Sequence, residues 1–143
     1  MNNIGLEKFL PSLFYKTEVD SEGTILLRFE EKKDKYVWVH TDEICFVISA
    51  DHYIKALIKT GSKKKWMSRH CTLKELLHIL PQGNFIRLNK FYVLNLDHFS
   101  HIDEKNTLLY FNDNICIPIP HRISPYLRKY LKAPIHEPVI SSI

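Results

Sequence analysis

Residues 85–95 interleave polar side chains that can contact a partner with apolar ones that can anchor a strand. Arg87 and Lys90 supply cations, and Asn89 and Asn95 supply amides. The apolar residues between them alternate as in a half-buried strand. Cations at such positions reach phosphates, and amides or cations reach the polar edges of bases. The stretch therefore predicts a strand-borne contact surface.

Patterns typical of catalysis or of metal binding are missing from the sequence. The chain has four glycines, and none of them forms a phosphate-binding loop motif. His98 and His101 lie three residues apart, which places them on opposite faces of a strand. The eight histidines show no H-E-x-x-H motif and no cysteine–histidine spacing typical of zinc. We expect no enzyme activity, no metal and no cofactor.

Length and charge bound the class of protein. A chain of 143 residues with 45% hydrophobic content can bury a core without disulfides, and two domains do not fit. The net charge of +4 and the isoelectric point near 8.9 are compatible with an anionic partner. Such a mild excess of positive charge does not establish an anionic partner. The distribution of the cations along the chain is the better indicator.

Cysteine usage and hydropathy point to a soluble protein of the cytoplasm. Cys45, Cys71 and Cys116 are widely spaced and form no C-x-x-C pair, which is typical of reduced thiols. Cys45 and Cys116 fall in apolar, strand-like runs, where a cysteine is usually a small buried hydrophobe. No apolar run approaches the roughly 20 residues that span a bilayer, and the N-terminal residues lack a basic n-region and a small-residue cleavage site.

The periodicity predicts mostly strands. Strand patterns occupy residues 24–29, 36–39, 44–48, 53–58, 66–69, 98–102, 107–111 and 115–119, with polar turns between them. Thr72 and Glu75 form a capping box that opens an apolar helix ending near Pro81. Ser124 and Pro125 predict the start of a last helix that ends near Leu131. Pro118 predicts that the strand before it lies at a sheet edge.

The first residues form a separate segment. Leu6, Phe9, Leu10 and Leu13 follow helical spacing, although Pro11 interrupts it. This arm either packs on its own domain or contacts a second copy of the chain. We expect an arm and first strand at 1–30, a binding domain at 31–133 and a tail at 134–143.

Four motifs in this order resemble the LytTR family of bacterial DNA-binding domains. The likeness covers about two thirds of the chain. Its motifs are, in order, residues 42–54 (DEICFVISADHYI), 72–80 (TLKELLHIL), 85–95 (FIRLNKFYVLN) and 117–122 (IPIPHR). The resemblance implies a mainly β fold of small stacked antiparallel sheets, with a short helix after the central strands and a C-terminal helix. It also implies binding of double-stranded DNA by loops between strands, which read successive major grooves.

Carried over by position, the family's base-reading places are His52, Asn89, Lys90 and the His121–Arg122 pair. Lys90 either contacts a base or phosphate or is an ordinary solvated lysine, and Asn89 either contacts a base or stabilises its turn. Arg87 matches a family arginine, which either contacts DNA or pairs within the fold. Pro120 and His121 replace the serine that precedes the family's arginine, so Arg122 is shifted by one place.

A second group of cations lies around residues 63–69. Lys63, Lys64 and Lys65, with Arg69 nearby, form either a phosphate clamp or a solvated hairpin tip that resists edge pairing. These residues complete the expected DNA-binding set.

Together these features predict a sequence-specific transcriptional regulator. The segment before Tyr36 is too short for a receiver domain, so we expect a stand-alone regulator that responds to a partner sensor or to dimerisation. The resemblance implies a homodimer on paired direct repeats. The alternative is a protein-interaction module that keeps the fold and has lost base readout.

Overall fold

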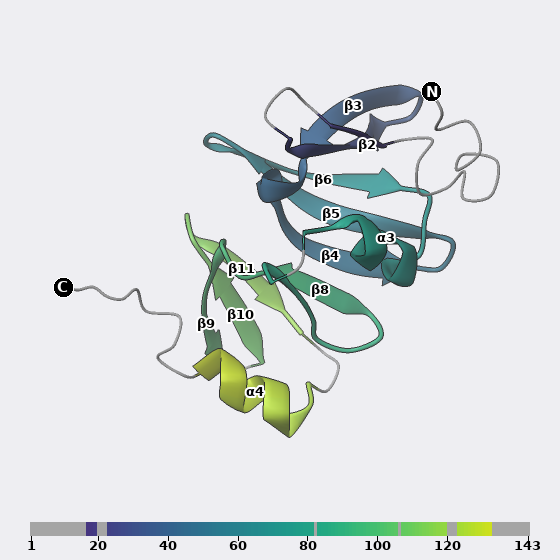
Figure 1. The fold of residues 1–143 in the computed structure, drawn as a ribbon. Helices are drawn as coiled ribbons and strands as arrows, with labels where there is room; N and C mark the ends of the chain where they lie inside the picture. The colour runs from purple at the N-terminus through teal and green to yellow at the C-terminus, as the bar shows by residue number, and fades with distance from the viewer. Residues whose placement is uncertain (1–16, 20–22, 82, 106, 120–122, 133–143) are drawn as a thin grey trace. The chain divides into compact units, whose positions relative to one another are not determined.

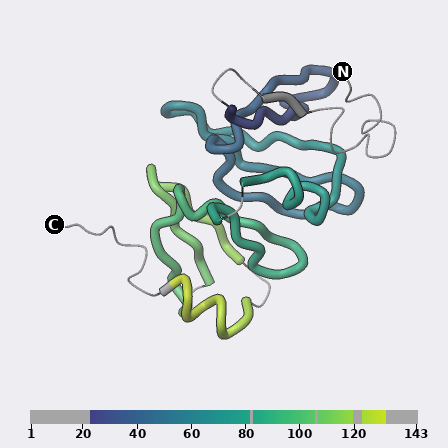
Figure 2. Tube along the Cα trace, viewed as in Figure 1, coloured from purple at the N-terminus to yellow at the C-terminus, as the bar shows by residue number. Residues whose placement is uncertain are grey.

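The computed structural model describes residues 17–19, 23–81, 83–105, 107–119 and 123–132 (Figure 2). The chain divides into two compact units, Met1–Asp97 and His98–Ile143. The described secondary structure is mainly β, with antiparallel sheets and two α-helices (Figure 1), as the sequence predicts.

The first unit contains one antiparallel sheet of eight described strands. Their order is β1-β2-β6-β5-β4-β8-β7, and β3 pairs with the other side of β2. The strands are β1 (Thr17–Val19), β2 (Ile25–Lys32), β3 (Lys35–His40), β4 (Ile44–Ala50), β5 (Tyr53–Thr60), β6 (Lys63–Arg69), β7 (Phe85–Arg87) and β8 (Tyr92–Asn95), and the short 3-10 helix η1 (Thr41–Glu43) precedes β4.

Alternation along the strands sorts the side chains onto two faces. Ile54, Ala56 and Ile58 of β5 belong to the buried core, and Phe29 of β2 joins the same cluster. Lys55 lies between these positions, so it belongs to the opposite face of the sheet. Its partners across the neighbouring strands are Ile48 and Ser68.

Helix α3 (Leu73–Ile79) contributes to this core through Leu73 and Leu76. The capping box predicted from the sequence is confirmed. Thr72 Oγ1 accepts a hydrogen bond from Glu75 N at 3.1 Å, and Glu75 Oε1 accepts one from Thr72 N at 2.9 Å. These two bonds satisfy backbone donors that the first turn of a helix leaves open.

The stretch 85–95 forms two strands, not one continuous strand. Strand β7 ends at Arg87, β8 begins at Tyr92, and Arg87 pairs with Val93 in the antiparallel register. The four residues between the strands form a tight turn, which we call the 88–91 turn. Apolar alternation continues through a hairpin of this length, and for that reason periodicity alone does not reveal the reversal.

The second unit is a three-stranded antiparallel sheet with one helix. Its strands are β9 (Phe99–Asp103), β10 (Leu108–Phe111) and β11 (Ile115–Pro118), in the order β11-β10-β9. Helix α4 (Pro125–Lys132) follows, and Ser124 Oγ accepts a hydrogen bond from Leu127 N at 3.2 Å. The predicted edge strand and the predicted serine cap are both confirmed.

The three cysteines all lie within the described ranges and form no disulfide there, and Cys45 and Cys71 are buried whereas Cys116 is exposed. The expectation that Cys116 is a buried hydrophobe is wrong. In β11, Ile115 and Ile117 face the interior, so the intervening Cys116 faces solvent. No helix in the described ranges is long and apolar enough to cross a membrane.

Candidate nucleic-acid interface

The 88–91 turn is held by the side chain of Asn89. Its Oδ1 accepts hydrogen bonds from Phe91 N at 2.8 Å and from Tyr92 N at 3.1 Å. Leu88 N closes the turn on Tyr92 O at 2.8 Å. An asparagine that accepts from backbone N–H groups two and three residues ahead stabilises a local reversal. Of the two alternatives for Asn89, the turn-stabilising role is thus present in the structure.

Arg87 holds the same turn from the preceding strand. Its Nε donates to Asn89 O at 3.0 Å and its Nη2 donates to Lys90 O at 3.3 Å. The guanidinium therefore binds two carbonyl groups that β-pairing leaves open. This is the structural pairing that the sequence left as one of two roles for Arg87.

Lys90 is exposed at the tip of this turn. Its Nζ lies 5.3 Å from the centroid of the Phe91 ring, which is within the range of a cation–π contact. Asn89 and Arg87 fix the backbone on either side of Lys90, and these bonds do not use its ammonium group. The structure thus presents one cation on a backbone that its neighbours immobilise.

The turn that carries His52 lies next to the 88–91 turn. His52 is exposed in the two-residue connection between β4 and β5, where Asp51 has a positive φ of 67°. Strands β4 and β8 are neighbours in the sheet, and Ser49 N donates to Phe91 O at 2.8 Å. Both turns therefore lie at the same end of adjacent strands (Figure 1). The structure brings together two of the regions that the sequence singled out.

His70 also belongs to this end of the sheet, and sequence reasoning missed it. It follows the last residue of β6, and its ring lies 6.1 Å from that of Tyr53. Its side chain is exposed. The antiparallel register of β5 and β6 pairs Ile54 with Arg69, which places His70 beside the start of β5. The strands predicted at 53–58 and 66–69 contain the signal, because pairing them as a hairpin places residue 70 beside residue 53.

The three lysines at 63–65 lie at the other end of the same hairpin. Lys63 pairs with Thr60 and Lys65 pairs with Ile58, whereas His52 precedes the opposite end of β5. At about 3.3 Å per residue, the length of β5 separates the two ends by about 23 Å. Lys63, Lys64 and Lys65 are exposed but do not join the His52–Lys90 end.

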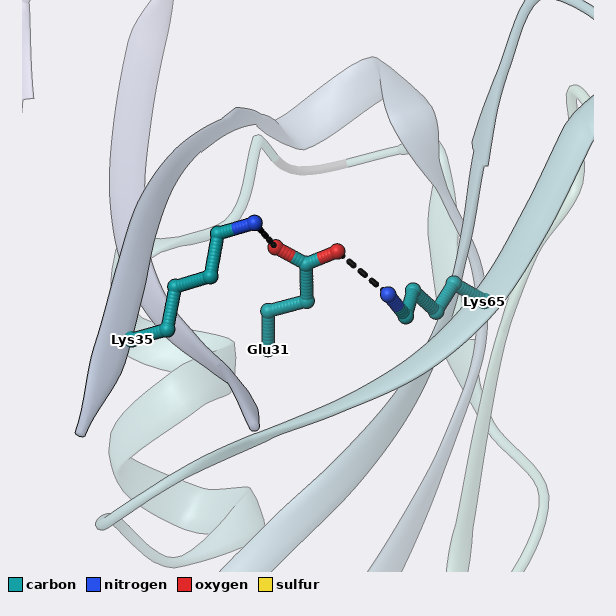
Figure 3. Close-up of polar contacts among 3 residues, drawn as sticks. All are labelled: Glu31, Lys35 and Lys65. Atoms are coloured by element: carbon teal, nitrogen blue, oxygen red, sulfur yellow. Dashed lines mark hydrogen bonds and ion pairs between the residues drawn. The ribbon is translucent and has the colours of Figure 1, made fainter. Parts of the chain in front are cut away.

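Lys65 has a structural partner in Glu31. A β-bulge in β2 places Glu31 between Lys35 and Lys65, and both lysines bind its carboxylate (Figure 3). The Lys35 Nζ to Glu31 Oε1 distance is 3.1 Å. Hydrogen bonds from Lys65 first, and from Lys35 second, lower the pKa of Glu31 from 4.5 to about 2. One of the three lysines is thus an ion-pair member within the fold.

Arg69 is buried, which argues against the predicted phosphate contact. Its side chain is 2% exposed, and Nη1 donates to Arg28 O at 3.1 Å. Burial lowers the pKa of its guanidinium below the ordinary value. Arg69 pairs with Ile54, so it belongs to the core face of β6. A side chain in this position cannot reach a duplex without leaving the core, and we omit it from the interface.

His121 and Arg122 lie outside the described residues, and so does the apolar arm at 1–16. The described part of the chain contains no cluster of three or more potential metal-ligating side chains.

Comparisons with known proteins bear on the family and the fold of this chain. The family model of the LytTr DNA-binding domain matches residues 34–132. Among solved structures, the chain resembles the LytTr DNA-binding domain of a protein named as a methyl-accepting/DNA response regulator of Bacillus cereus. The sequence identity is 21% and the TM-score is 0.55, over 74% of this chain and 95% of that one. The comparison with curated proteins gives no match.

The solved structure supports the fold, and the family model covers more than half of the sequence. The chain therefore belongs to the LytTr DNA-binding domain family.

Proposed function

We propose that this protein is a sequence-specific transcriptional regulator that binds double-stranded DNA with the 88–91 turn and the neighbouring turn at His52. Lys90 would donate to base edges in the major groove, most favourably to the O6 and N7 acceptors of guanine. His52 and His70 would lie beside it at the same end of the sheet. The cytoplasm would be its place of action.

One observation carries the proposal. The Ser49–Phe91 hydrogen bond joins the strands that carry the two turns, and Arg87 and Asn89 hold the backbone under Lys90. A fixed backbone lowers the conformational entropy lost when a side chain docks against bases. Membership of a DNA-binding family supports the same partner.

Lys63 and Lys64 are proposed as phosphate contacts. Because they lie a strand length from the reading end, they would contact the backbone of a different part of the duplex. Such contacts add affinity without sequence preference.

The test starts from a preferred duplex selected from a random pool. On that duplex, Lys90→Ala should weaken binding by about 1–3 kcal/mol and reduce the preference for it over other sequences. Lys63→Ala, an exposed lysine to alanine change at the far end of the sheet, is the matched control. It should weaken binding to all duplexes alike. Equal losses on every duplex for both variants would contradict base reading by Lys90.

Salt dependence tests the alternative, a protein-interaction module without DNA readout. Release of counterions gives a slope near −0.9 per phosphate contact in a plot of log affinity against log salt concentration. A flat response would favour the alternative.

We further propose that two copies of the protein bind paired direct repeats. Comparing the affinity for duplexes with one site and with two sites tests this proposal. Input from a partner sensor protein is part of the same proposal.

A further inference from the structure

A groove lies on the face of the first unit's sheet that carries Lys55, and the proposed DNA contacts do not use it. Its cavity has a volume of about 580 Å³. Its lining comes from β2 and the turn after it, from β4, β5 and β6, and includes Lys33, Ile48, Lys55, Trp66 and Met67. Sites for small organic ligands have volumes of roughly 300–1,000 Å³. The groove is therefore of a size that suits one small molecule.

The floor of the groove is a row of cross-strand partners. Glu30 pairs with Ser68, Ser68 with Lys55, and Lys55 with Ile48. Trp66 lies two residues before Ser68 on the same face and is 42% exposed. Trp66 and Ile48 line the same groove from β6 and β4, on either side of β5. An indole left this open offers a flat apolar surface, on which an aromatic ring can stack.

The charges around the groove favour an anion. Lys32, Lys33 and Lys55 line it, all three are exposed, and none has an ion pair within the described part of the chain. Of the two lining carboxylates, Glu31 is bound by Lys35 and Lys65. These pairs leave the lysines of the groove as its dominant charges.

The second carboxylate, Glu30, is held by the hairpin turn. Its Oε2 accepts a hydrogen bond from Asp34 N at 3.1 Å. Lys55 lies at the centre of the sheet face, with Ile48 on one side and Ser68 on the other. An ammonium group in such a half-apolar setting is stabilised by an acidic group that enters with an apolar body.

We propose that this groove binds a small organic anion whose flat apolar body lies on Trp66 and Ile48 and whose acidic group pairs with Lys55. The inference is independent of DNA binding, because no residue of the 88–91 turn or of the His52 turn lines the groove.

The probe for the test is 1-anilinonaphthalene-8-sulfonate, an aromatic anion that accepts excitation energy from tryptophan. The chain has two tryptophans, so the measurement uses a Trp38→Phe background in which Trp66 is the sole donor. Saturable energy transfer from Trp66 to the probe is expected. N-phenyl-1-naphthylamine, which has the same ring system without the sulfonate, should bind at least about tenfold more weakly, the loss expected for one charge-assisted contact.

Two variants locate the acidic group. Lys55→Met keeps the length of the side chain and should weaken binding of the sulfonate about tenfold, while leaving the uncharged probe unaffected. Lys105→Met is the matched control, because it removes an exposed lysine of the second unit. It should change the affinity for neither the sulfonate nor the uncharged probe. Lys33→Met is a second variant at the rim of the groove, and it should also weaken binding of the sulfonate.

The unfolding midpoint of each variant is measured alongside, so that a folding defect is recognised. Transfer that does not saturate would overturn the proposal, and so would equal affinity for the two probes. A sulfonate affinity that Lys55→Met and Lys33→Met leave unchanged would overturn it as well. The assay contains no DNA, so its failure is distinct from a failure of the proposed regulator function.

Discussion

At the 88–91 turn, three polar side chains have separate roles. Asn89 binds backbone N–H groups, Arg87 binds backbone carbonyl groups, and Lys90 extends to solvent beside the Phe91 ring. The first two roles concern the shape of the turn, whereas the exposed ammonium group of Lys90 takes part in none of these hydrogen bonds. Losing Asn89 should therefore affect stability before it affects recognition.

Asn89→Ala should lower the free energy of unfolding by about 1 kcal/mol, because two backbone donors lose their acceptor. Asn89→Asp is the control, since a carboxylate oxygen can accept the same two hydrogen bonds. Its stability should stay close to that of the parent protein in urea unfolding followed by circular dichroism. If the alanine and aspartate variants lost equal stability, Asn89 Oδ1 would not be the group that holds the turn.

At the scale of elements, the ion pairs of Glu31, the bulged residue of β2, link three strands. Glu31 belongs to β2, and its two lysine partners belong to β3 and β6. The bulge supplies the extra residue that turns this carboxylate toward both of them. The β2–β3 hairpin is thus linked to β6 by charge as well as by the Glu30–Ser68 pairing.

This link should depend on pH. The pKa of Glu31 is lowered from 4.5 to about 2, so its ionised form is stabilised by folding. The contribution is complete above pH 4.5 and is lost as the pH falls toward 2. Glu31→Gln should be less stable than the parent at pH 7, and the difference should vanish near pH 2.

Glu30→Gln is the matched control for that measurement. It neutralises the adjacent carboxylate, but its amide oxygen can still accept from Asp34 N. Chemical denaturation across the pH range separates the two variants. A Glu31→Gln deficit that stayed constant down to pH 2 would contradict the assigned shift.

For the molecule as a whole, each unit has buried residues of its own. The first unit has a core in which Leu76 of α3 is fully buried with residues of β2, β4 and β5, such as Phe29 and Ile54. In the second unit, Leu109 and Phe111 of β10 are buried. Helix α3 is short, so tertiary contacts and not helix propensity must stabilise it.

Leu76→Ala should therefore lower the stability of the protein by about 2–5 kcal/mol, the range for a leucine truncated in a close-packed core. Leu77→Ala is the control, because Leu77 is the next residue of the same helix and is only partly buried. Its loss should be clearly smaller in equilibrium urea unfolding. Equal losses for the two variants would show that Leu76 does not have the core position assigned to it.

The sequence predicts most of the elements, because their signals are local. The capping box at Thr72 and the alternation in β5 are read directly from residue types. The role of Arg69 could not be read in this way, since its burial depends on the strand register that pairs it with Ile54. The same register decides that Lys63 and His52 lie at opposite ends of β5. Charge and spacing along the chain contain no such information.

The hydrogen bonds under Lys90 have a consequence for how such proteins diversify. Arg87 and Asn89 make the turn without the Lys90 side chain, so residue 90 can be exchanged while the scaffold beneath it persists. Under the proposed base reading by Lys90, gene duplicates would acquire distinct operators through single codon changes at this position, without first evolving a new loop.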